Sequence, residues 1–390
     1  MVIYKNYKNY PIKIGFDAYF LSYRRGIGNF VYHVLSHLAF LDRKNQYLLY
    51  MAAKPKNLDL SLPQNFILRS FACPIYPLWE QIGLPFVAIR DSVDILHCPA
   101  NTGPLFLPQK IKMVLTIYDV MYLLPYEVLP ASPSPYQRLG RIYRRWVVPR
   151  IAKRADAIIT DSHHSCQDIL HILQVPSERV SVVYGAPSPT FRPLPNKEKI
   201  EQVKQRYGIK GRFILTLGGL DPRKNIARVL QSFKKFKQQS KSDHQLVIVG
   251  LPKSGQRLFS RIAMEMEIAE QVVFTGFVPE EDLVALYNGA EVFLYPSLYE
   301  GFGLPVLEAM ACGTPVIAST AGSIPEIAGE AALLIEPKDI EALALAIEQV
   351  INDQALRLEL IVRGFEQVKK FSWEKAAREL LTVYERVMQT

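Results

Sequence analysis

The segment 295–313 combines glycines, a proline and two glutamates in the string YPSLYEGFGLPVLEAMACG. We expect a strand to end here, a Gly-Phe-Gly loop to follow, and Pro305 to open a helix with Glu308 in its first turn. Free N–H groups at such a helix start suit an anion such as a diphosphate. Glu308 could then bridge two neighbouring ribose hydroxyls, and Glu300 could reach the hydroxyls of a second sugar. From spacing alone, Glu308 could equally serve only the helix dipole while Glu300 is solvated.

A pair of cations lies in a second loop, within LTLGGLDPRKNIARVLQSF. Arg223 and Lys224 fall between a predicted strand and a predicted helix, at the end of a parallel strand where open α/β sheets bind ligands. Two cations there could clamp a diphosphate and stabilise its charge as it leaves. A lone Arg-Lys pair is otherwise a solvated helix start.

The sequence contains no Asp-x-Asp pair, which is the usual ligand set of metal-dependent sugar transferases. Arg223, Lys224 and the helix start would then neutralise the diphosphate themselves. We therefore expect no metal ion and no cofactor.

The elements around these loops alternate between strand and helix in the second half of the chain. Strands are predicted at 212–219, 244–250, 271–278, 291–297 and 314–319, with helices from 225, through 257–268, at 280–290 and at 305–313. Short strands alternating with helices predict βαβ units and a parallel sheet.

The first half follows the same pattern less regularly. Strands are predicted at 12–18, 46–52, 94–100, 112–119 and 155–162, and a helix is predicted after Gly28. Since 390 residues exceed one typical core, we expect two domains joined by the proline-rich segment 184–199. A last helix at 372–388 could pack on either domain.

These motifs together resemble the retaining glycosyltransferases of family 4, whose Glu-x7-Glu signature matches Glu300 and Glu308 with the Gly-Phe-Gly-Leu-Pro interior intact. The resemblance covers nearly the whole chain. It implies the GT-B fold: two Rossmann-like, doubly wound parallel-sheet domains facing a central cleft. Residues 1–190 would bind the acceptor, 191–371 the nucleotide-sugar, and 372–390 would cross back to the first domain.

The resemblance also assigns donor contacts. The backbone at Phe277 and Val278 would receive the base edge, although a strand end before an ordinary helix fits equally well. The glycine loop with Gly26 and Gly28 would face the donor phosphates and the acceptor. The full set of donor-binding residues is Gly28, Gly219, Arg223, Lys224, Phe277, Val278, Glu300, Gly301, Phe302, Gly303, Leu304 and Glu308.

Two positions depart from the family pattern. Gly219 stands where many members carry a further arginine, so one phosphate contact is missing. Tyr118 stands where relatives commonly have histidine before Asp119. Asp119 is either an acceptor-side carboxylate or a helix-cap or turn residue. In the first interpretation it is the fourth predicted catalytic residue, after Glu300, Lys224 and Arg223. His97, at a strand end, is more typical of a structural histidine than of a catalyst.

Charge is unevenly distributed along the chain. Residues 1–190 contain 21 Lys and Arg against 12 Asp and Glu, whereas 191–390 contain 25 of each. The segment 137–154 has seven basic residues, no acidic one, and arginines 138, 141 and 145 on one helical face. It is either a solvated face or a contact with an anionic membrane. No nucleic-acid recognition module accompanies it, so we expect no nucleic-acid partner.

The sequence thus predicts transfer of a sugar from a nucleotide-sugar, with UDP-glucose first and GDP-mannose second, to a polysaccharide or lipid-linked glycan. The alternative is a catalytically inactive nucleotide-sugar-binding protein. The intact Glu-x7-Glu string argues against a phosphorylase or an epimerase. No apolar run approaches the ~18–20 residues that span a bilayer, and we expect a cytoplasmic enzyme, peripheral on the inner face of the membrane if 137–154 binds it.

Overall fold

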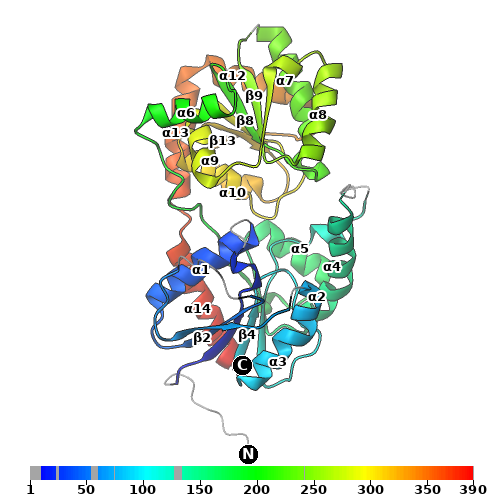
Figure 1. Cartoon of the computed structure of the whole chain (residues 1–390), viewed down its shortest axis with the longest axis vertical. Helices are drawn as coiled ribbons and strands as arrows, with labels where there is room; N and C mark the ends of the chain where they lie inside the picture. The colour runs from blue at the N-terminus through cyan, green and yellow to red at the C-terminus, as the bar shows by residue number, and fades with distance from the viewer. Residues whose placement is uncertain are drawn as a thin grey trace, which may run out of the picture. The chain divides into compact units, whose positions relative to one another are not determined.

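The computed structural model describes residues 10–22, 26–53, 60–73, 75–126, 134–240 and 242–389. The chain divides into two compact α/β units, each with a central sheet and flanking helices (Figure 1). Unit 1 comprises Met1–Leu123, Gly140–Gly185 and Ser372–Thr390, and unit 2 comprises Leu124–Leu139 and Ala186–Phe371. The change at residues 185–186 falls inside the proline-rich segment 184–199. The sequence did not anticipate that 124–139 would group with unit 2.

Unit 1 contains a seven-stranded parallel sheet in the order β3-β2-β1-β4-β5-β6-β7. Its strands are β1 (Lys13–Asp17), β2 (Gln46–Met51), β3 (Phe66–Ser70), β4 (Ile95–Cys98), β5 (Lys112–Thr116), β6 (Ala157–Thr160) and β7 (Val180–Val182). All five predicted strands are confirmed. The two that the sequence missed, β3 and β7, are the edges of the sheet, where a strand needs less apolar sequence because it has one neighbour.

Helices connect these strands, and a last helix belongs to unit 1 although it follows unit 2 in the chain. They are α1 (Ile27–Leu41), α2 (Tyr76–Leu78), α3 (Leu84–Arg90), α4 (Pro135–Arg154), α5 (His163–Leu173) and α14 (Trp373–Gln389), with a π-helical turn at Trp79–Gly83 and 3-10 turns η1 (Tyr19–Ser22), η3 (Met121–Leu123) and η4 (Ser177–Arg179). Within the ranges given above, no helix combines the length and the apolar character needed to cross a membrane.

Unit 2 contains a six-stranded parallel sheet in the order β10-β9-β8-β11-β12-β13. Its strands are β8 (Phe213–Leu217), β9 (Gln245–Val249), β10 (Val272–Gly276), β11 (Val292–Tyr295), β12 (Val316–Ser319) and β13 (Ala332–Ile335). The five predicted strands are confirmed, and the missed one, β13, is again an edge. Central strands such as β11 and β12 are buried along their whole length, as expected for a sheet covered on both faces.

Helices and short turns complete unit 2. They are α6 (Lys197–Arg206), η5 (Pro222–Lys224), α7 (Ile226–Ser240), α8 (Lys253–Glu265), η6 (Ala269–Gln271), α9 (Glu280–Gly289), α10 (Leu304–Ala311), α11 (Ile324–Ala328), α12 (Ile340–Asn352) and α13 (Gln354–Val368). The apolar faces of α7 and α12 meet strands β8, β9 and β11 in one buried core that includes Phe233, Leu246, Leu294 and Ile347. This core fixes the strands, and hence the loops that leave their ends.

The last helix, α14, packs in unit 1, a choice that the residue pattern left open. Tyr384 on α14 is fully buried, and its hydroxyl lies 2.6 Å from Nδ1 of His97 at the end of β4. The other ring nitrogen, Nε2, lies 2.8 Å from Oγ1 of Thr116 on β5. Burial lowers the pKa of His97 to about 3, so the ring is neutral. His97 is therefore a structural histidine, as its sequence context suggests.

We expect Tyr384→Phe to lower the free energy of unfolding by about 1–3 kcal/mol, because it leaves a buried ring nitrogen of His97 without its partner. Urea unfolding followed by circular dichroism measures this. The matched control is Tyr136→Phe, since Tyr136 is 84% exposed and should tolerate the same change. Equal stability of the two variants would show that the bond between α14 and β4 contributes little.

Candidate functional site

The loops that follow β8, β9, β10 and β11 meet at one edge of the second sheet. Because the strands are parallel neighbours, their carboxyl ends lie side by side. Backbone hydrogen bonds join the loops: Gly218 N donates to Val249 O (2.6 Å), Gly250 N to Gly276 O (2.7 Å) and Leu298 N to Arg223 O (2.8 Å). This is the edge at which open α/β sheets bind ligands.

The loop between β8 and α7 holds the predicted cations. Asp221 caps the short turn η5, accepting a hydrogen bond from the backbone N–H of Arg223 at 3.1 Å. Asn225 ends the turn with φ 60°, and its side-chain amide donates to the carbonyls of Pro296 (2.9 Å) and Pro337 (2.6 Å). Because Asn225 is buried and bonded on both sides, it fixes the backbone that carries Arg223 and Lys224.

Two glycines hold the loop between β11 and α10 in place, one inside it and one in the loop that follows β12. Gly303 has φ +105°, and a Cβ there would lie 2.6 Å from Cδ1 of Ile324. Gly322 has φ +63°, and a Cβ there would lie 2.6 Å from the carbonyl oxygen of Glu300. Ser323 donates to the same carbonyl from its N–H (3.1 Å) and its hydroxyl (3.0 Å). Only glycine fits these left-handed, close-packed positions, and together they fix Glu300.

Glu300 bridges the two cations. Its Oε2 accepts from Arg223 Nη1 at 2.5 Å, and its Oε1 accepts from Lys224 Nζ at 2.8 Å and from the Tyr295 hydroxyl at 2.8 Å. The Tyr295 hydroxyl in turn accepts from Lys224 Nζ at 2.7 Å. The structure therefore brings three of the four predicted catalytic residues into direct contact and leaves their side chains 10–19% exposed.

The charge states of this cluster follow from its partners. Burial alone would raise the pKa of Glu300, but the charges of Arg223 and Lys224 outweigh it and hold the pKa at about 2. Burial lowers the pKa of Lys224, and the Glu300 carboxylate opposes that shift. Glu300 is therefore ionised at neutral pH, and the charges of the cluster depend on one another.

Glu308 lies in the second turn of α10, which corrects the sequence prediction. The helix begins at Leu304, with Pro305 in its first turn, so no acidic residue falls in that turn. Glu308 is 8% exposed, and its Oε2 accepts from the Tyr287 hydroxyl at 3.3 Å. Burial raises its pKa to about 7. Near neutral pH this carboxyl group is thus poised between its charged and neutral forms.

The other predicted donor residues of unit 2 lie along the same edge. Gly301, Phe302 and Gly303 are buried in the loop before α10, and Phe302 packs edge-on against Phe371 with ring centroids 6.0 Å apart. Phe277, 58% exposed, and Val278 follow the end of β10.

Gly219 has space for a side chain. A Cβ there would lie 3.4 Å from Cγ of Lys224, and its φ is outside the left-handed region. Backbone geometry therefore does not require glycine at this position. If position 219 held an arginine, as in many family members, its side chain would begin next to that of Lys224.

The predicted residues of unit 1 lie at the ends of its own elements. Gly28 belongs to the first turn of α1, which begins at Ile27, so it is not the loop residue that the sequence predicted. Gly26 is the N-cap, with φ 51° and open space around it. Asp119 follows β5, and its Oδ1 accepts from the N–H of Met121 at 3.1 Å. This bond is that of a turn residue.

Sequence reasoning missed three side chains of the site. Tyr295 joins Lys224 to Glu300, Asp221 pairs with Arg223 (Oδ2 to Nε, 3.2 Å), and Tyr287 contacts Glu308. Tyr295 opens the glycine-rich string itself, and Asp221 stands two residues before Arg223, so proximity in sequence was a usable signal. Tyr287 is separated from Glu308 by a strand and a loop and gives no such signal.

Two family profiles match the chain. The profile described as "Glycosyl transferases group 1" covers residues 197–367, and "Glycosyltransferase Family 4" covers residues 24–186. Among curated proteins, the O-antigen chain mannosyltransferase B of Escherichia coli is 30% identical over 299 residues, which cover 76% of each chain. The serotype-specific mannosyltransferase WbdA of Escherichia coli is 31% identical over 72% of this chain, which spans only 34% of WbdA.

Solved structures with the same fold cover nearly the whole chain. Sucrose-phosphate synthase from Thermosynechococcus elongatus has a TM-score of 0.72 at 20% identity, covering 97% of this chain and 99% of that one. Anabaena HepE in complex with UDP and glucose has a TM-score of 0.70 at 16% identity, covering 96% and 100%. The sequence matches confirm the resemblance: this chain belongs to glycosyltransferase family 4 and has the GT-B fold of two parallel-sheet α/β domains.

Proposed function

We propose that the protein transfers a hexose from a nucleotide-sugar to a hydroxyl of a polysaccharide or lipid-linked glycan, retaining the configuration at the sugar carbon. Unit 2 binds the donor and unit 1 the acceptor. The observation that carries the proposal is the meeting of Arg223, Lys224, Glu300 and Glu308 at one edge of a parallel sheet.

Each of these residues has a distinct role in the transfer. Arg223, Lys224 and the N–H groups at the start of α10 bind the diphosphate and stabilise its charge as the bond to the sugar carbon breaks, without a metal ion. Glu308 accepts the ribose hydroxyls, and Glu300 accepts hydroxyls of the transferred sugar. The acceptor oxygen bonds to the sugar carbon on the face that the diphosphate leaves, and its proton passes to a phosphate oxygen of the leaving nucleotide.

The names of the relatives bear on the sugar and on the pathway. Several are mannosyltransferases, and one acts on the O-antigen chain, a surface polysaccharide. They favour mannose as the transferred sugar and GDP-mannose as the donor, ahead of the UDP-glucose that the sequence analysis placed first.

The test is an assay with labelled GDP-mannose and UDP-glucose, with and without a glycan acceptor and in the presence of EDTA. We expect release of nucleotide that depends on the acceptor and survives the chelator, and a product with the donor's anomeric configuration by NMR. Donor binding without turnover on any glycan tried would favour the inactive nucleotide-sugar-binding alternative. Activity lost in EDTA and restored by magnesium would contradict the metal-independent reading.

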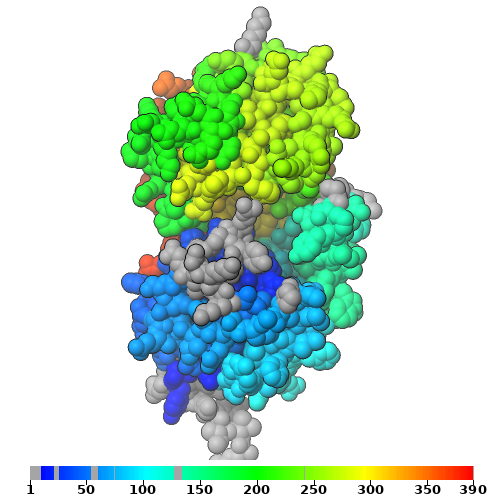
Figure 2. All heavy atoms as spheres, in the orientation of Figure 1, coloured from blue at the N-terminus to red at the C-terminus, as the bar shows by residue number. Residues whose placement is uncertain are grey.

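A second proposal concerns α4 and an anionic membrane on the cytoplasmic side. Arg141, which the sequence placed on the basic face, is buried and donates from Nε to the carbonyl of Tyr122 at 3.1 Å. The exposed face of α4 instead carries a stripe of apolar side chains with cations on both sides. In Figure 2 this helix is part of the teal surface. Its exposed apolar members are Tyr136, Leu139, Ile142 and Trp146, and its exposed cations are Arg138, Arg145, Arg150, Lys153 and Arg154. This combination is typical of helices that lie in a membrane interface.

We expect Glu308→Ala to weaken donor binding by roughly 1–3 kcal/mol, because ribose hydroxyls lose their acceptor. Since the pKa of Glu308 is raised to about 7, wild-type affinity should fall as the pH drops from 8 to 6 and the carboxylate gains a proton. Glu308→Gln should remove that slope. Titration calorimetry with a nucleotide-sugar measures both effects, and Glu330→Ala, at an exposed position, is the control. Unchanged affinity in Glu308→Ala would refute the ribose assignment.

We expect Lys224→Ala to lower turnover by about 100-fold or more, because charge develops on the leaving diphosphate beside Nζ. Arg223→Ala should lower it by the same amount or less. Steady-state kinetics measure kcat, with Lys369→Ala as a control that removes a lysine from an exposed ion pair. Normal turnover in both Lys224→Ala and Arg223→Ala would place the diphosphate elsewhere.

For the membrane contact, we expect salt-sensitive sedimentation with anionic but not neutral vesicles, since each cation contributes about 1 kcal/mol at best near an anionic surface. The variant Arg138→Ser/Arg145→Ser should weaken it, and Ile142→Ser/Trp146→Ser should weaken it at every salt concentration. The control changes two exposed lysines of α6, Lys197 and Lys199, to serine. Equal sedimentation of all four proteins would exclude α4 as the contact.

A further inference from the structure

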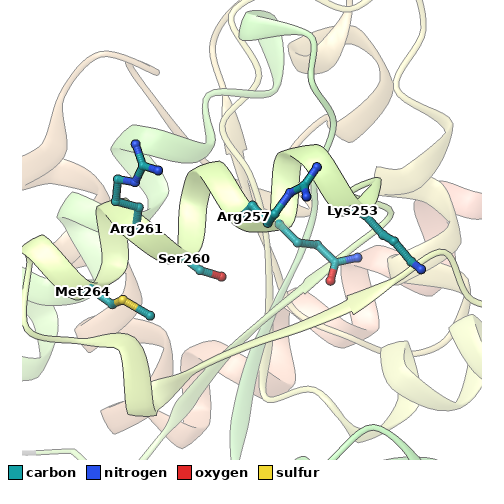
Figure 3. A pocket seen from close by; sticks show the side chains of 6 residues that line it. Lys253, Arg257, Ser260, Arg261 and Met264 are labelled. Atoms are coloured by element: carbon teal, nitrogen blue, oxygen red, sulfur yellow. The ribbon is translucent and has the colours of Figure 1, made fainter.

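A hollow of about 620 Å³ lies along α8, and its polar side chains do not converge. Its lining includes Lys253, Arg257 and Arg261 but neither Glu300 nor Glu308. In Figure 3 the three cationic side chains start from separate turns of the helix and do not meet at one point. Polar groups do converge at the two glutamates, where two tyrosine hydroxyls reach the carboxyl groups.

Three aromatic rings form a column in the core of unit 2. The ring of Tyr287 on α9 packs edge-on against that of Phe293 on β11, with centroids 5.1 Å apart, and Phe293 stacks on Tyr295 with centroids 5.6 Å apart. Phe293 and Tyr295 are two residues apart on one strand, so their side chains lie on the same face of the sheet. All three residues are at most 2% exposed, and close packing holds the rings in place.

The two tyrosines of this aromatic column each present a hydroxyl to one glutamate. The Tyr295 hydroxyl donates to Glu300 Oε1 at 2.8 Å, and the Tyr287 hydroxyl donates to Glu308 Oε2 at 3.3 Å. Burial raises the pKa of both tyrosines well above its usual value, so each hydroxyl keeps the proton that it donates. The two carboxyl groups of the Glu-x7-Glu string therefore share one rigid support.

Tyr295 differs from the other partners of Glu300 in its charge. Among the side chains that the structure describes as bonded to this carboxylate, Arg223 and Lys224 are cations and Tyr295 is neutral. Under the proposed function, an arriving diphosphate attracts both cations away from the carboxylate. The hydroxyl of Tyr295 has no charge that phosphate attracts, so it can stay bonded to Oε1 and keep the carboxylate directed at the sugar.

Tyr287 affects the charge of Glu308 as well as its position. Burial raises the pKa of Glu308 to about 7, the hydrogen bond from Tyr287 lowers it, the charge of Glu280 raises it and the charge of Lys224 lowers it. Cys312 at the end of α10 stays neutral, since burial and the charge of Glu308 raise the pKa of its thiol to about 12. Removing the Tyr287 hydroxyl should therefore shift proton uptake by Glu308 to higher pH.

We propose that the two tyrosines are positioning residues for the two glutamates. Tyr295 holds Glu300 toward the hydroxyls of the transferred sugar. Tyr287 holds Glu308 toward the ribose. The inference rests on the proposed function, because it requires a nucleotide-sugar at these carboxylates, and it divides recognition of that donor between two hydroxyls of one aromatic column.

The first experiment measures the affinity of the full-length protein, by titration calorimetry, for GDP-mannose and for its analogues that lack the 3- or the 4-hydroxyl. In the wild type, loss of the hydroxyl that Glu300 binds should weaken binding about tenfold or more, the value of one hydrogen bond to a charged group. In Tyr295→Phe the same loss should be about threefold or less, because the carboxylate is no longer held toward that hydroxyl. UDP-glucose and its corresponding analogues replace these ligands if the wild type binds UDP-glucose more tightly.

The second experiment follows the pH dependence of binding of the same nucleotide-sugar. In Tyr287→Phe the midpoint should move upward by about one pH unit, because the ionised form of Glu308 loses a hydrogen-bond donor. The response of this variant to the hydroxyl analogues should match that of the wild type. Tyr295→Phe should conversely keep the wild-type midpoint.

The matched control is Tyr207→Phe, which removes a tyrosine hydroxyl that donates to Asp282 Oδ2 at 2.7 Å elsewhere in unit 2. It should change neither measurement. A wild-type response to the analogues in Tyr295→Phe, or an unmoved midpoint in Tyr287→Phe, would overturn the inference. Equal effects of both variants on both measurements would also overturn it, since the column would then act only through stability. If the wild type binds neither GDP-mannose nor UDP-glucose, the proposed function fails instead.

Discussion

The edge of the second sheet at which the loops after β8 and β11 meet depends on one carboxylate held between two cations. Glu300 accepts from both Arg223 and Lys224, and the two loops that carry these residues are also joined by the backbone bond from Leu298 to Arg223. In the partly buried setting, each charge would be costly alone, because removing any one leaves the others desolvated without compensation. The bridge therefore ties the loops after β8 and β11 together at the carboxyl edge of the sheet.

Glycines allow the loops at this edge of the sheet to pack against one another. The strands β8, β9 and β10 are followed by or end in Gly218, Gly250 and Gly276, and a Cβ at Gly218 would lie 2.8 Å from Leu251. At Gly303 and Gly322 a side chain would collide with Ile324 and with the backbone of Glu300. The loops can thus approach each other closely enough for Arg223, Lys224, Glu300 and Tyr295 to form one network.

The sequence predicted the central strands of both sheets and the two loops that carry Arg223, Lys224 and Glu300, because strands and loops of this kind have local sequence signals, whereas the ion pairs of Glu300 with the two cations appear only in the structure. A buried parallel strand is a continuous apolar run, and the glycines and charged residues of a ligand loop are close in sequence. Edge strands such as β3 and β13 were missed, since one exposed side removes that signal. The contact of Tyr287 with Glu308 and the burial of Arg141 depend on packing between distant segments. Helix periodicity alone cannot show which face of α4 turns inward.

The charges of Arg223 and Lys224 are balanced within the cluster, and under the proposed function this affects how a donor would be recognised. Arg223 and Lys224 are balanced by Asp221 and Glu300, so an arriving diphosphate competes with the protein's own carboxylates for the two cations. Under the proposed function, the hydroxyls of the transferred sugar give Glu300 new partners as the phosphates take its cations. A nucleoside diphosphate without a sugar would leave Glu300 buried and repelled by the phosphates. In that function, the same bridge that orders the loops would couple recognition of the sugar to recognition of the diphosphate, and would favour the intact donor over the spent nucleotide.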